Sequence, residues 1–94
     1  MPQNTTISIP AATWTQITNA DISSITFQNV GTNYMLVKGT TSAVAPTNTD
    51  GSLRYNPGQG EKNVYLIDLF PGISGVDRAW CYSPDGTSVA VSHA

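Results

Sequence analysis

The feature of this sequence that most constrains its fold is an alternation of apolar and polar residues with a period of two. The alternation lies in residues 6–9, 14–18, 25–28, 64–70, 78–82 and 88–92, and residues 34–38 form a nearly continuous apolar run. A period of two is typical of a β-strand, whose successive side chains point to opposite faces, and a continuous run is typical of a strand covered on both faces. Because no window of about eleven residues carries a helical apolar stripe, we expect at most one short helical turn, around residues 20–23.

Turn-forming residues separate these segments. Gly31-Thr32-Asn33 has the length of a hairpin loop, and Asp50-Gly51 is a signal for a type I′ hairpin turn. Residues 57–60 and 71–75 are predicted loops, and Pro84-Asp85-Gly86 is a predicted turn. The predicted fold class is all-β: a small antiparallel β-sandwich or barrel of about seven to eight strands. With 94 residues, the chain is expected to form a single domain over residues 1–94.

Two segments are expected to lie outside the strands. We predict a flexible N-terminal arm over residues 1–5 and an exposed loop over residues 40–50, which is rich in Thr, Ser, Ala, Pro and Asn. The N-terminal residues carry no cation and no apolar run, so no signal peptide is expected. The apolar run Met35-Leu36-Val37 is far shorter than the roughly 20 residues of a membrane span.

The charge and cysteine content exclude several classes of function. Lys and Arg total 4, Asp and Glu total 6, and the net charge is −2. Binding nucleic acid requires a basic patch against the phosphates, so no nucleic-acid partner is expected. The single cysteine allows no disulfide within the chain and no cysteine-based metal site, which fits folding in a cytosol. We predict that Cys81 is a buried, inert thiol.

The residues of catalysis are poorly represented. The only histidine is His93, expected in a solvated tail, and the adjacent Ser92 would point to the opposite face of a strand. The glycines of residues 58–62 lack the spacing of a phosphate-binding loop. We therefore expect no enzyme, no cofactor and no metal; the open alternative is a hard cation on Asp50, Asp77 or Asp85.

Five residues are candidates for an interface. Asp68 lies in the apolar segment 64–70 and needs a partner: Arg54, Arg78 or a backbone N–H within the chain, or a charge in another subunit. Most aromatic side chains must form the core of so small a domain, but exposed ones would indicate a protein interface or a sugar site. Arg54-Tyr55, before the Pro-Gly loop, is the best candidate for an exposed contact patch. The candidate interface therefore consists of Trp14, Arg54, Tyr55, Asp68 and Arg78.

Several stretches together resemble a known kind of protein. They are IPAATWTQIT (Ile9 to Thr18), VGTNYMLV (Val30 to Val37), DLFPGISG (Asp68 to Gly75), RAW (Arg78 to Trp80) and VSHA (Val91 to Ala94). The chain resembles small virion proteins encoded in the head modules of tailed bacteriophages and prophages, of the capsid decoration (cement) or head-spike-base type.

The resemblance implies a non-enzymatic β-domain on the capsid surface of a virion, assembled in the host cytoplasm and bound to the major capsid protein. It implies no membrane partner and transfers no binding residues. A core of this size gives marginal stability, which oligomerisation commonly remedies, so we expect a homo-oligomer. The resemblance favours a trimer. Two alternatives stay open: a small carbohydrate-binding or receptor-recognition module on a virion, and a connector or tail component.

Overall fold

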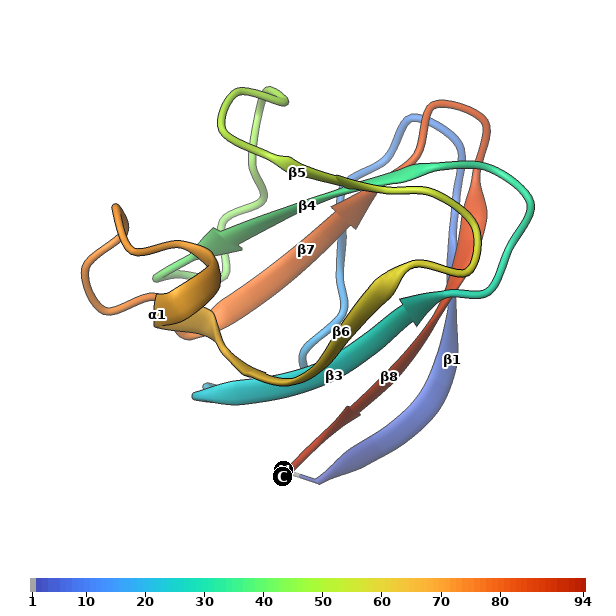
Figure 1. Cartoon of the computed structure of the whole chain (residues 1–94). Helices are drawn as coiled ribbons and strands as arrows, with labels where there is room; N and C mark the ends of the chain where they lie inside the picture. Colours follow the sequence, from blue (N-terminus) through green and yellow to red (C-terminus); the bar gives the residue numbers. More distant parts are fainter. Residues whose placement is uncertain (1) are drawn as a thin grey trace.

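Two antiparallel sheets of four strands pack face to face in the computed structural model, which describes residues 2–94 (Figure 1). Sheet 1 contains, in spatial order, β1 (Gln3–Ile9), β8 (Thr87–His93), β3 (Ser24–Asn29) and β6 (Gly60–Tyr65). Sheet 2 contains β2 (Thr15–Gln16), β7 (Arg78–Tyr82), β4 (Met35–Thr40) and β5 (Leu53–Tyr55). A single helical turn, α1 (Leu66–Leu69), follows β6. The predicted all-β sandwich is confirmed, with eight strands.

The strand order is that of a jelly roll. The chain pairs β1 with β8, β2 with β7, β3 with β6 and β4 with β5, as if one long hairpin were wrapped around the core. Only β4 and β5 are consecutive strands within one sheet, and every other connection crosses from one sheet to the other. The hairpin predicted at Gly31-Thr32-Asn33 is therefore wrong, since this loop joins β3 in sheet 1 to β4 in sheet 2.

The core lies between the sheets and follows the alternation of the sequence. Its fully buried members include Ile9, Ile17, Ile25, Phe27, Met35, Val37, Leu66, Val89 and Val91. Cys81 is buried among them, as predicted, and burial raises the pKa of its thiol above the usual range. An inert thiol is the result.

The segment after β6 departs from the predicted strand. β6 ends at Tyr65, and the chain turns into α1, where the Phe70 N–H donates to the Leu66 carbonyl at 2.9 Å. Leu66 and Phe70, one turn apart, are both buried. A short apolar run suits a strand or a buried helical turn equally well, so period alone cannot separate the two. The helical turn predicted at residues 20–23 is wrong, and no helix among residues 2–94 is long and apolar enough to cross a membrane.

The predicted N-terminal arm is wrong for residues 3–5, while Met1 lies outside the described residues. All of β1 pairs with β8, from Gln3 opposite His93 to Ile9 opposite Thr87. The Gln3 side chain also donates from Nε2 to the Ile17 carbonyl at 2.9 Å. Thr5, Ile7 and Ile9 alternate with Asn4, Thr6 and Ser8, and the β-branched residues among them favour a regular strand over a loose end.

The loop between β4 and β5 is predominantly exposed, as predicted. The Ser52 N–H donates to the Thr49 carbonyl at 3.2 Å, which closes a turn around Asp50-Gly51. Only Gly51 has a positive φ in this turn, at 73°. A type I′ turn needs positive φ at both central residues, so that prediction is wrong.

One buried side chain ties together the loops at one end of the sandwich. Asn29, fully buried, donates from Nδ2 to the carbonyls of Asn33 (2.8 Å) and Tyr55 (3.1 Å). Its Oδ1 accepts from the Gly31 N–H (3.1 Å) and the Thr87 hydroxyl (2.9 Å). Three connections, β3–β4, β5–β6 and β7–β8, therefore meet at one amide whose hydrogen bonds are all satisfied.

Candidate interaction surface

The outer face of sheet 2 carries the large polar and aromatic side chains of its strands. In β7, Ala79 and Cys81 face the core, so the alternate residues face outward. The same parity turns Arg54 of β5 outward, between two inward-facing neighbours. The outward set on the three longer strands is Leu36, Lys38, Thr40, Arg54, Arg78, Trp80 and Tyr82.

Across this face runs a set of side chains that we name the aromatic stripe: Tyr34, Arg54, Leu36, Tyr82 and Trp14. Leu36 on β4 lies opposite Arg54 on β5 and opposite Tyr82 on β7. The Arg54 guanidinium lies 3.9 Å from the centroid of the Tyr34 ring. On the other side, the rings of Tyr82 and Trp14 lie 5.2 Å apart at 40°. The stripe thus extends from β5 to the residue before β2, and its members are half-buried, except Arg54, which is exposed.

A second row lies beside the stripe. Trp80 is opposite Lys38 and Gln16 on the neighbouring strands, and its indole N–H donates to the Thr40 hydroxyl at 2.8 Å. Only 6% of Trp80 is exposed, so this ring packs against its neighbours on the sheet and has little surface left to contact a partner. Lys38 reaches the β4–β5 loop, where Nζ lies 3.2 Å from Oδ1 of Asn48.

Positive charge is concentrated on this face. Three of the four cations, Lys38, Arg54 and Arg78, belong to sheet 2 and point outward. Arg78 is paired with Asp21 at 2.8 Å and approaches Asp77 at 3.7 Å. Within residues 2–94, Lys38 and Arg54 have no carboxylate within ion-pair distance. A partner with carboxylates would therefore complement this face electrostatically.

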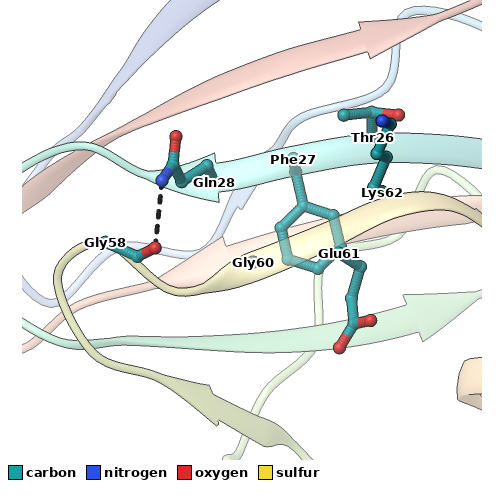
Figure 2. A pocket seen from close by; sticks show the side chains of 7 residues that line it. All are labelled: Thr26, Phe27, Gln28, Gly58, Gly60, Glu61 and Lys62. Carbon is teal, nitrogen blue, oxygen red and sulfur yellow. Dashed lines mark hydrogen bonds between the residues drawn. The ribbon is translucent and has the colours of Figure 1, made fainter.

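The outer face of sheet 1 has the opposite character. Its outward positions on β1, β8 and β3 are Asn4, Thr6, Ser8, Ser88, Ala90, Ser92, Ser24, Thr26 and Gln28, all small or neutral polar residues. The edge strand β6 adds Lys62 and the exposed Tyr65, which lies opposite Ser24. A shallow pocket opens between β3 and β6, where Gln28 donates to the Gly58 carbonyl at 2.9 Å, while Phe27 and Glu61 point to the other side of the strands (Figure 2). Among residues 2–94, no pair of stacked aromatic rings lies on this face.

Three of the five predicted interface residues lie on the outer face of sheet 2: Trp14 and Arg54 in the aromatic stripe, and Arg78 at the other end of β7. The exposure predicted for Tyr55 is wrong, because only 7% of this residue is exposed. Its ring packs edge-on against Phe27 at 5.0 Å, and its hydroxyl donates to Glu61 at 3.1 Å. Burial, together with Glu61, raises the pKa of the Tyr55 hydroxyl well above its usual value.

The pairing of Asp68 with Arg54 or Arg78 of the same chain is also wrong, while a pairing with another subunit stays a prediction. Asp68 lies on α1 with its side chain exposed, and neither Arg54 nor Arg78 contacts it. A carboxylate on a surface turn is solvated and needs no partner, whereas one in the middle of an apolar strand would have needed one.

Sequence reasoning missed Tyr34, Leu36 and Tyr82. The signal was present for Tyr82, which has the same parity as Arg78 and Trp80, opposite Ala79 and Cys81. Tyr34 and Leu36 belong to a continuous apolar run, which is typical of a strand covered on both faces. Among residues 2–94, no further layer covers the outer side of β4, so Leu36 stays half-exposed.

His93 is not in a solvated tail. It ends β8, only 8% of it is exposed, and its Nδ1 lies 3.0 Å from the Ala94 carbonyl oxygen. The described residues offer Nε2 no hydrogen-bond partner. Asp50, Asp77 and Asp85 join no cluster of three metal-ligating residues in the part of the chain that the structure describes.

Comparison with known proteins adds no relative: no family model, no curated protein and no solved structure matches the chain. The function must therefore be argued from the chemistry of this surface.

Proposed function

We propose that this protein is a non-enzymatic structural virion protein that decorates or stabilises a phage capsid, and that the outer face of sheet 2 binds the shell. The observation that carries the proposal is the aromatic stripe, which crosses all of sheet 2 with no layer above it. Trp, Tyr and Arg are the residue types that contribute most to protein–protein binding energy. The resemblance of the sequence to phage head-module proteins selects the capsid as the partner.

The stripe is pre-organised for binding. Its side chains extend from a hydrogen-bonded sheet, and Arg54 is already held against Tyr34 at 3.9 Å. Little side-chain entropy is then lost on association, so more of the contact energy appears as affinity. We infer that the partner surface offers carboxylates to Arg54 and Lys38 and apolar pockets to Trp14 and Tyr82.

A capsid suits a small interface of this kind. A face of four strands, two of them only two or three residues long, buries a modest area in each contact. On a shell, the same contact recurs at every equivalent site, and linked copies reinforce one another. The jelly-roll architecture, which occurs in viral capsid domains and also in lectins, supports the proposal by analogy of fold alone.

Co-sedimentation with emptied, expanded capsids tests the proposal. We expect the wild-type protein to pellet with the shell at saturable stoichiometry. Arg54→Ala and Trp14→Ala should each weaken binding about tenfold or more, which corresponds to the roughly 1.4 kcal/mol or greater loss at an interface hot spot. Lys62→Ala is the matched control, because it removes one exposed cation from sheet 1. Wild-type protein that stays in the supernatant, or Arg54→Ala that binds as Lys62→Ala does, would overturn the proposal.

The second candidate is a carbohydrate-binding or receptor-recognition module on a virion. It is favoured by the exposed parts of the Trp14 and Tyr82 rings, since sugars stack on aromatic faces. The 40° tilt between these rings gives a less even platform than coplanar rings would. Quenching of tryptophan fluorescence by one member of a sugar panel, lost in Trp14→Ala, would favour this second function.

A further inference from the structure

The four edge strands of the sandwich differ in how well they are protected against pairing with another chain. In sheet 2, the edges are β2, with two residues, and β5, with three. In sheet 1, the edge β6 carries Glu61 and Lys62, and its pairing with β3 shifts register next to Asn63, which has a positive φ of 48°. Short length, charge and irregularity are the usual means by which proteins prevent edge-to-edge association.

The fourth edge, β1, has none of these features. It is seven residues long and pairs with β8 in one unbroken register. Between Gln3 and Ile9, it contains no charged residue and no proline. Figure 1 shows β1 at the outer side of sheet 1, with β8 as its neighbour. Its second edge therefore presents backbone N–H and C=O groups that no strand among the described residues pairs.

We propose that β1 pairs in antiparallel orientation with β1 of a second copy of this chain. The two four-stranded sheets then join into one continuous sheet across a two-fold axis. Full-length pairing of this strand with itself sets Thr6 opposite the second copy's Thr6 and Asn4 opposite its Ser8. Hydroxyl and amide side chains of this kind form favourable cross-strand pairs, and no like charges meet.

Among the four strand edges of the chain, the β1 edge of a second copy is the best partner for this edge. A head-to-tail ring, such as a trimer, would require β1 to pair with a different edge, and the other three edges are short, charged or irregular. The β1 edge of a second copy is therefore the partner that we propose for this edge, which gives a two-fold pair where the resemblance favours a trimer. The contact uses no residue of the aromatic stripe, so it does not depend on the proposed docking of sheet 2.

Solution mass tests the pairing directly. Light scattering and sedimentation over a dilution series should give a dimer at high concentration that dissociates to a monomer on dilution. Thr6→Lys, at an exposed position in the middle of β1, should give a monomer throughout, because two ammonium groups would meet at the axis. Thr47→Lys, in the exposed β4–β5 loop, adds the same charge elsewhere and should leave the dimer intact.

A charge swap separates loss of pairing from loss of folding. Thr6→Asp alone should also be monomeric, and an equimolar mixture of Thr6→Lys and Thr6→Asp should restore a dimer, seen as a heterodimer by native mass spectrometry. Wild-type protein that is monomeric at every concentration, or a Thr6→Lys variant with the wild-type mass profile, would overturn the inference. A mixture of the two variants that stays monomeric would do the same. Because no capsid is present, these outcomes leave the sheet 2 proposal to its own test.

Discussion

Replacing Asn29 by alanine should destabilise the fold far more than replacing any other asparagine of the sandwich. Asn29 is fully buried and makes four hydrogen bonds, two donated to backbone carbonyls and two accepted. The alanine side chain makes none of them. The groups left without a partner lie in the β3–β4 loop, at the end of β5 and at the start of β8, so the loss falls where the connections between the two sheets begin and end.

The magnitude follows from the bonds and their burial. A hydrogen bond contributes about 0.5–1.5 kcal/mol net, and a buried group left unpaired costs about 1–3 kcal/mol. The bond to the Tyr55 carbonyl is buried and takes the higher cost, whereas water can reach Gly31 and Thr87, which are half-buried. The sum is about 3–5 kcal/mol, against a free energy of unfolding of about 5–14 kcal/mol for a chain of this length.

Urea unfolding followed by tryptophan fluorescence and circular dichroism measures this loss. With an m value of about 1–2 kcal/mol/M, the midpoint for Asn29→Ala should fall by about 1.5–5 M at unchanged m. Asn33→Ala is the matched comparison, because the Asn33 side chain makes one hydrogen bond, to the Gly86 carbonyl at 2.7 Å, and should cost about 1 kcal/mol. Equal midpoints for the two variants would refute the reasoning.

Three further predictions concern the core and the sheets. In Gly60→Ala, the new Cβ would collide with the backbone carbonyl of Phe27 on β3, so this variant should lower the unfolding midpoint sharply, whereas Gly72→Ala, with open space around it, should not. The pKa of Tyr55 is higher in the folded than in the unfolded protein, so its contribution to stability is complete below about pH 10 and is lost as the pH rises further. Tyr55→Phe should therefore flatten the alkaline fall of the melting temperature, and Tyr65→Phe, at an exposed tyrosine, should leave it unchanged. Cys81 should react with an alkylating reagent only at the rate of unfolding, and rapid labelling of the native protein would contradict its burial.

Much of the fold follows from local pattern, because each strand must alternate in order to bury one face. The alternation around Ile25 and Phe27, or around Ala79 and Cys81, states which side chains face the core. The order in which the strands pair does not follow from local pattern. Gly31-Thr32-Asn33 can close a hairpin or cross between sheets, and the choice depends on where β8 inserts beside β3, some 60 residues away in the sequence.

The candidate surface, too, was predictable only where local alternation decides which side chains are exposed. Arg54 and Arg78 are cations in alternating segments, so their exposure follows from parity. Tyr55 has the parity of the core, but a tyrosine before a Pro-Gly loop looks exposed until Phe27 and Glu61 are placed beside it. Contacts between strands distant in sequence decide such cases, and no local pattern contains them.

Oxidative footprinting of the protein free and bound to expanded capsids tests the central claim most directly. The rings of Trp14 and Tyr82 should lose reactivity on binding, because the shell would cover the outer face of sheet 2. Tyr65, 56% exposed at the end of β6 in sheet 1, is the internal reference and should react equally in both states. Unchanged reactivity of Trp14 and Tyr82 in the bound protein, or protection of Tyr65 instead, would contradict the assignment of sheet 2 as the docking face.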